Sequence, residues 1–120
     1  VSFANGTPRD TNSAGSIFIN NTPLLLNNLT VRYSRPSSVA LQLKNTNTII
    51  TGGLIKNETK ILFDPSSASY GVGILIDGGA PNLSSLIIDT FTYGIIRKNN
   101  PKETRDGINF INVDKQIMAW

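Results

Sequence analysis

Carboxylates are the first candidates for chemistry, because the chain contains eight acidic residues but no histidine and no cysteine. Two carboxyl groups held about 5 to 10 Å apart can hydrolyse a glycosidic bond, one as the acid and the other as base or nucleophile. Asp77 ends a predicted strand, and Glu58 and Asp64 lie in an insertion, residues 57–70. We therefore predict a candidate catalytic site with Asp64 or Glu58 opposite Asp77. The alternative, which we favour, is that Asp77 makes a turn with Gly78-Gly79, where aspartate is common.

Two basic residues, Arg97 and Lys98, could instead remove a proton beside a uronate carboxylate in an elimination reaction. Lys98 falls where the repeat predicts an aliphatic residue, and a charge in a core position costs free energy unless it finds a partner or solvent. The aliphatic residues expected at this position in other repeats are Ile19, Leu43 and Ile76. The simpler interpretation is that the strand ends at Ile96 and leaves Lys98 outside the core.

Binding of carbohydrate without cleavage would need exposed aromatic rings and polar groups. Tyr70 and Tyr93 are the candidates for stacking on sugar rings, with Arg97 and Lys98 beside them as polar contacts. Tyr93 falls on an apolar alternation and could belong to the core. Tyr70 lies in the insertion and is therefore the stronger candidate.

Other kinds of site are excluded by composition. Without cysteine or histidine the chain has no disulfide, no zinc site of the usual ligands and no Ser-His-Asp triad. We expect neither a metal nor another cofactor. The net charge is +3, and the basic residues are too scattered for a nucleic-acid-binding face. No segment approaches the ~20 apolar residues that span a bilayer.

The positions of these candidates depend on a repeat of two-strand units. Similar openings begin at Gly15, Ser38, Gly71 and Gly94, which gives steps of 23, 33 and 23 residues. Behind each opening, apolar residues alternate, skip to a spacing of three, and alternate again. Alternation indicates a strand with one buried face, and the change of spacing indicates a bend. The apolar sets that we match between repeats are Leu24, Leu26, Leu29 and Val31; Leu86, Ile88, Phe91 and Tyr93; and Ile108, Phe110 and Val113.

This pattern predicts an all-β fold, a right-handed parallel β-helix with coils of about 23 residues. Such short strands are stable when each pairs with its equivalent in the next coil and the aliphatic side chains stack in columns. The alternative is an antiparallel sandwich, whose short strands also recur regularly. Residues 1–14 read as a connecting segment or a partial coil, and residues 15–120 as coils with the insertion at 57–70. The stretch from Lys115 departs from the repeat and could begin a new coil or cap.

The ends of such a stack need cover, because open strand edges and a bare core are exposed there. We find no amphipathic capping helix at either end. The chain is therefore expected to be a fragment of a longer β-helix or to be covered by partners. A homotrimer would provide that cover, and so would end-to-end packing.

Residues 15–114 resemble the pectin-lyase-like β-helix superfamily, on openings such as Gly73-Ile74-Leu75-Ile76-Asp77. The composition, rich in Asn and Thr, is most similar to that of bacteriophage tailspikes and tail fibres. The resemblance implies a trimeric virion protein that binds, and in some members depolymerises, bacterial surface polysaccharide. The alternatives are a free, secreted polysaccharide lyase or glycoside hydrolase, and a structural spacer in a virion or surface assembly. The chain lacks the Asn-Thr-Asp, Asp-Asp and Gly-His motifs of polygalacturonases, so no catalytic residue carries over.

Overall fold

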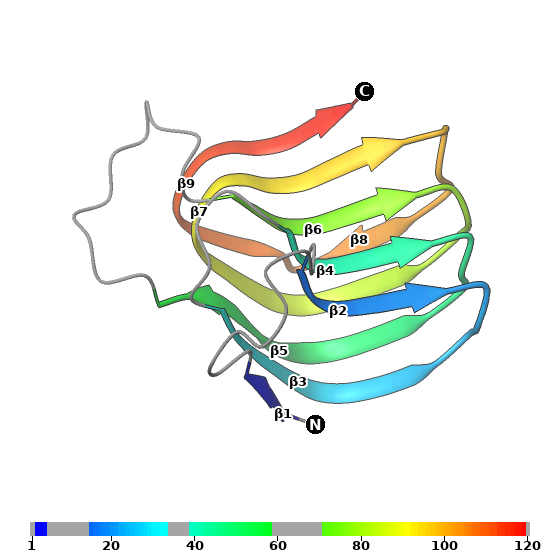
Figure 1. Cartoon of the computed structure of the whole chain (residues 1–120), viewed down its shortest axis with the longest axis horizontal. Helices are drawn as coiled ribbons and strands as arrows, with labels where there is room; N and C mark the ends of the chain where they lie inside the picture. The colour runs from blue at the N-terminus through cyan, green and yellow to red at the C-terminus, as the bar shows by residue number, and fades with distance from the viewer. Residues whose placement is uncertain (1, 5–14, 34–38, 59–70, 120) are drawn as a thin grey trace.

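The protein is all-β, as predicted. The computed structural model describes residues 2–4, 15–33, 39–58 and 71–119 (Figure 1), and these contain no helix. Asp64 and Tyr70, two of the predicted site residues, lie outside the described ranges. The strands are β1 (Ser2–Ala4), β2 (Gly15–Asn20), β3 (Leu25–Tyr33), β4 (Val39–Lys44), β5 (Ile49–Asn57), β6 (Val72–Asp77), β7 (Asn82–Lys98), β8 (Thr104–Asp106) and β9 (Asn109–Ala119).

All the strands belong to one parallel sheet that curls on itself. Its order is β1-β3-β5-β7-β6-β4-β2, with β8 and β9 also paired to β7. The seventeen-residue strand β7 bends, so that its first half pairs with β5 and its second half with β6. As a result, β2, β4 and β6 face β3 and β5 across a shared core (Figure 1). Every recorded pair is parallel, which excludes the antiparallel sandwich for the described residues.

The register differs from the predicted constant step. One column of paired residues runs Ile17, Leu41, Ile74, Ile95 and Ile117. Its successive steps are therefore 24, 33, 21 and 22 residues. The long step was predicted correctly, whereas the steps of 23 were not. The strands align on their inward aliphatic side chains, and the glycines and serines that open the sequence repeats do not keep a fixed distance from them.

The match between the first and third repeats was wrong by one bend. Leu29 pairs with Gly53, which pairs with Leu86, and Val31 connects in the same way through Ile55 to Ile88. The sequence match failed because the long strand has two bends with the same apolar spacing. The match between the third and fourth repeats is confirmed, since Ile88 pairs with Phe110 and Phe91 with Val113.

The bends are made by residues with left-handed backbone. At the first bend these residues lie in register, one in each coil, with φ between 53° and 76°: Asn28, Gly52, Ser85 and Gly107. At the second bend Thr90 lies opposite Asn112, with φ of 67° and 51°. Asparagine and glycine adopt this conformation at low cost. The Asn-rich composition therefore serves the corners of the coil.

The core contains aliphatic columns with an aromatic side chain at the second bend. Phe91 is fully buried. A Cβ added at Gly73 would lie 3.4 Å from its ring and 2.8 Å from the carbonyl oxygen of Gly94. A Cβ added at Gly94 would in turn lie 2.5 Å from the ring of Phe110. These two glycines therefore leave the space that the phenylalanines fill.

The C-terminal stretch continues the repeat, contrary to the prediction that it departs from it. Lys115 pairs with Tyr93 and Ile117 with Ile95, as part of an eleven-residue β9. The mixture of charged and apolar residues hid the alternation. It has a structural reason, because β9 is an outermost strand and most of its side chains are partly exposed.

Candidate functional site

Polar residues gather where β2, β4, β6 and the second half of β7 end side by side, on the right of Figure 1. The last residues of these strands are paired in register and form what we call the strand-end row: Asn20, Lys44, Asp77 and Lys98. Neighbouring strands in a sheet lie about 4.8 Å apart. The row therefore presents a carboxylate between two ammonium groups, an order that is electrostatically favourable.

The residues that follow the row form a tight corner. Asn21, Asn45, Gly78 and Asn99 all have left-handed backbone. The N–H of Asn45 donates to the carbonyl oxygen of Asp77 at 2.8 Å, and the N–H of Gly78 donates to that of Lys98 at 2.9 Å. The predicted turn after Asp77 is thus confirmed. Backbone hydrogen bonds between successive coils hold the corner in place.

The side chain of Asp77 has an internal partner. Its Oδ1 accepts a hydrogen bond from Nδ2 of Asn99 at 2.5 Å, and the residue is only 8% exposed. A buried acceptor without a donor is costly, so this bond has structural value. Asp77 therefore stabilises the corner between β6 and β7.

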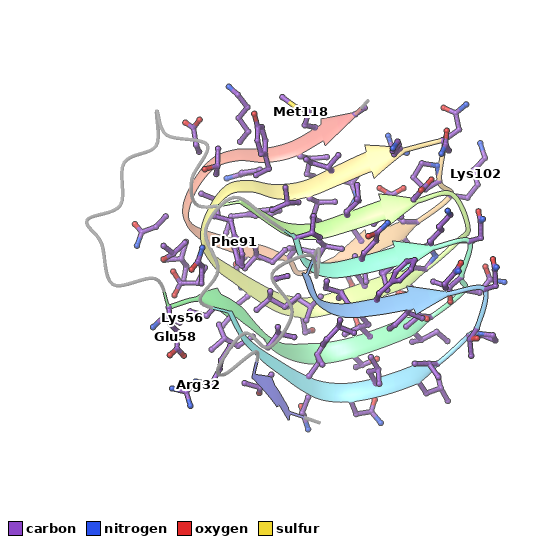
Figure 2. All side chains as sticks on the ribbon, in the orientation of Figure 1. Arg32, Lys56, Glu58, Phe91, Lys102 and Met118 are labelled. Atoms are coloured by element: carbon purple, nitrogen blue, oxygen red, sulfur yellow. The ribbon has the colours of Figure 1, made fainter. Side chains whose placement is uncertain are left out.

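The structure does not bring Glu58 near Asp77. Glu58 follows the end of β5, on the left in Figure 1, whereas Asp77 ends β6 on the right. A six-residue strand such as β6 spans about 17 Å, well beyond the separation that paired carboxylates need. Glu58 instead accepts two hydrogen bonds from Arg32, at 2.6 and 3.0 Å. Figure 2 shows the two side chains beside Lys56. The hydrogen bonds to Glu58, and then the attraction between the charges, raise the pKa of Arg32 above its ordinary value.

Arg97, and not Lys98, occupies the aliphatic column. Arg97 pairs with Ile76, and Lys98 pairs with Asp77. Arg97 is accommodated by a nearly buried carboxylate: its Nε lies 2.5 Å from Oε2 of Glu103, whose side chain is 2% exposed. Its Nη2 also donates to the carbonyl oxygen of Pro101 at 3.1 Å. Lys98 is exposed at the end of its strand, as the simpler interpretation predicted.

Sequence reasoning missed Glu103, which connects two arginines. Its Oε2 also lies 3.4 Å from Nε of Arg105. The available signal was the alternation of charge in the polar stretch after β7, where Glu103 and Arg105 are separated by one residue. We had treated that stretch as a loop, although Thr104–Asp106 forms β8 and pairs with β7.

A hollow of about 510 Å³ lies next to this cluster at the last coil. Its polar side is formed by residues 103–107 and its apolar side by Ile108, Phe110 and Ile117. Tyr93 pairs with Val72 and Lys115 and is half-buried, so part of its ring reaches the surface. The structure thus keeps Tyr93, Arg97 and Lys98 on one strand, and their side chains differ in exposure.

Loss of the buried carboxylate should destabilise the last two coils. Glu103→Gln removes the negative charge that Arg97 and Arg105 share, and we expect it to lower the free energy of unfolding by about 1 to 2 kcal/mol, since both arginines can still reach water. Urea denaturation followed by circular dichroism measures this change. Glu58→Gln is the matched control, because its partner Arg32 is exposed, and it should have a much smaller effect. Equal effects of the two variants would contradict a structural role for Glu103.

No protein-family model matches the chain, and no curated protein or solved structure matches it either. Among the described residues there is no helix long and apolar enough to cross a membrane. Those residues also contain no group of three or more metal-ligating side chains. The proposals that follow therefore depend on the geometry of this chain.

Proposed function

We propose that the chain is a segment of a parallel β-helix of the tailspike or tail-fibre type that binds bacterial surface polysaccharide. The curled parallel sheet supports this architecture, with coils close to 23 residues. The observation that carries the binding proposal is the strand-end row. Lys44, Asp77 and Lys98 repeat along the stack at the spacing of the coils, so an extended polymer lying across the strand ends meets a cation, an anion and a cation in turn.

The chemistry of the row fits an acidic polysaccharide. Lys98 is exposed and Lys44 is half-buried, so both ammonium groups can reach a ligand carboxylate. Asp77 and Asn99 hold the corner between them in a fixed position through their hydrogen bond. Tyr93 contributes a partly exposed ring farther along β7. The proposed setting is a trimeric phage tail protein, with the sugar-binding surface on the outside of the stack.

Binding to purified capsular polysaccharides and lipopolysaccharides, measured by biolayer interferometry, tests this proposal. Lys98→Ala is expected to weaken binding by about tenfold or more, because charge-assisted hydrogen bonds contribute about 1.5 to 3 kcal/mol. Lys56→Ala is the matched control, since Lys56 lies on the opposite margin of the sheet (Figure 2) and should leave affinity unchanged. Failure of the wild-type chain to bind any polymer, or equal losses for both variants, would overturn the proposal.

The same polymers distinguish binding from cleavage. Shortened chains without new ultraviolet absorbance would indicate a hydrolase, and Asp77→Asn should then abolish the activity. New absorbance from an unsaturated uronate would indicate a lyase, and Arg97 and Lys98 would be the residues to replace. A structural spacer is the second candidate function. It is favoured by the internal partners of Asp77 and Glu103, which leave both carboxylates engaged in holding coils together.

A further inference from the structure

The two ends of the stack present free strand edges of the same kind. β1 and β2 are the two ends of the strand order, and among the described residues β9 pairs only with β7. Each edge therefore exposes backbone N–H and C=O groups that are unpaired in the isolated chain. Such edges are templates for pairing with another strand of matching direction. Because all strands are parallel, an edge at one end of the stack matches the edge at the other end.

The side chains of the core columns end in the same incomplete way. In the column that runs from Ile17 to Ile117, the inner members Leu41, Ile74 and Ile95 are 0% exposed. Ile117 is 45% exposed and Ile17 is half-buried, because each lacks a neighbour on one side. The hollow at the last coil has the same cause, since Ile108, Phe110 and Ile117 line it and nothing within the described residues covers them.

We propose that two copies of this chain stack head to tail, with β9 of one copy pairing in parallel with β2 of the next. The pairing places Ile117 opposite Ile17 and extends the aliphatic column without a break. The registers within the chain supply the template: β2 pairs with β4 through Ile17 and Leu41, and β7 pairs with β9 through Ile95 and Ile117. The new contact repeats this established interface between coils.

The first half of β9 has a matching partner in β1. Phe3 pairs with Val31 at the N-terminal end, and that column continues through Ile55 and Ile88 to Phe110. β1 of the second copy can therefore lie over Phe110 while β2 lies over Ile117. The contact joins two different surfaces, so it does not close on itself and adds copies one after another. This inference is independent of polysaccharide binding.

Sedimentation velocity of the full chain over a wide range of concentrations tests the proposal. We expect a series of species that grows with concentration. Ile117→Lys and Ile17→Lys should each weaken self-association by at least about tenfold. Ile111→Lys is the matched control: Ile111 is also 45% exposed and lies on β9, but its column contains Arg32, Lys56 and Asp89 instead of the core aliphatics. It should associate like the wild type.

A mixing experiment separates a lost contact from a lost fold. Ile117→Lys keeps an intact β2 edge, and Ile17→Lys keeps an intact β9 edge. The two variants, each unable to self-associate, should therefore form a one-to-one complex when mixed. A wild-type chain that stays monomeric at every concentration would overturn the proposal. So would a mixture that yields no complex, or a closed trimer that is unaffected by either substitution.

Discussion

Replacing Gly53 with alanine should lower the free energy of unfolding by more than about 3 kcal/mol. Gly53 lies at the first bend with φ of 142°, and an added Cβ would lie 2.0 Å from the carbonyl oxygen of Leu29 and 2.8 Å from its nitrogen. Both atoms belong to the backbone of the neighbouring strand β3, so neither can move without disturbing the pairing of β3 with β5. Backbone strain of this kind costs about 1 to 3 kcal/mol by itself, and the steric overlap adds to it. Urea denaturation measures the loss.

Gly52→Ala is the control, because it tests left-handed backbone without the overlap. Gly52 has φ of 76°, and the nearest atom to an added Cβ is the Oδ1 of Asn28 at 3.1 Å, on a side chain that can turn away. The expected cost is about 1 to 2 kcal/mol. If Gly53→Ala were no more destabilising than Gly52→Ala, the close approach of β3 and β5 at this bend would be wrong.

Phe91→Ala is expected to destabilise the fold by about 3 to 5 kcal/mol. Phe91 is fully buried and lies at the second bend. The space around it is set by Gly73, whose missing Cβ would lie 3.4 Å from the ring. A backbone that is paired on both sides cannot collapse into the space left by the ring, so most of the cavity should remain. Thermal unfolding followed by circular dichroism gives the change in stability.

Phe18→Ala removes the same ring from a surface position and serves as the comparison. Phe18 is 59% exposed, so its loss should cost less than about 1 kcal/mol. A small effect of Phe91→Ala would mean that the second bend can repack. In that case Gly73→Ala should also be tolerated, since the overlap it creates would be relieved by the same movement.

The alternation of apolar residues was enough to predict strands, bends and parallel stacking. It was not enough to predict register. Leu24-x-Leu26 and Leu86-x-Ile88 have the same spacing, yet the first lies before the first bend and the second lies after it. Only the pairing of whole coils distinguishes the two bends, because each is followed by another apolar alternation. The length of a coil is fixed by stacked side chains and not by the residue that opens it.

The candidate site was less predictable for the same reason. Glu58 and Asp77 are close in the repeat, but β5 and β6 run in opposite directions across the coil, and their ends lie on opposite margins (Figure 1). A one-residue difference in register placed Lys98 in the core column where Arg97 belongs. Glu103 could not be recognised as the partner of Arg97 until the chain between them was known to turn back along β7.

The three passages from one half of the sheet to the other have very different lengths. Residues 34–38 separate β3 from β4, residues 58–71 separate β5 from β6, and β7 crosses without interruption. The strands on either side nevertheless keep one continuous register, from β4 to β6 and from β6 to β7. The coil thus tolerates inserted sequence at this margin. A protein engineer could therefore use the margin as a rack, with peptides grafted into successive coils and displayed in a row one strand spacing apart.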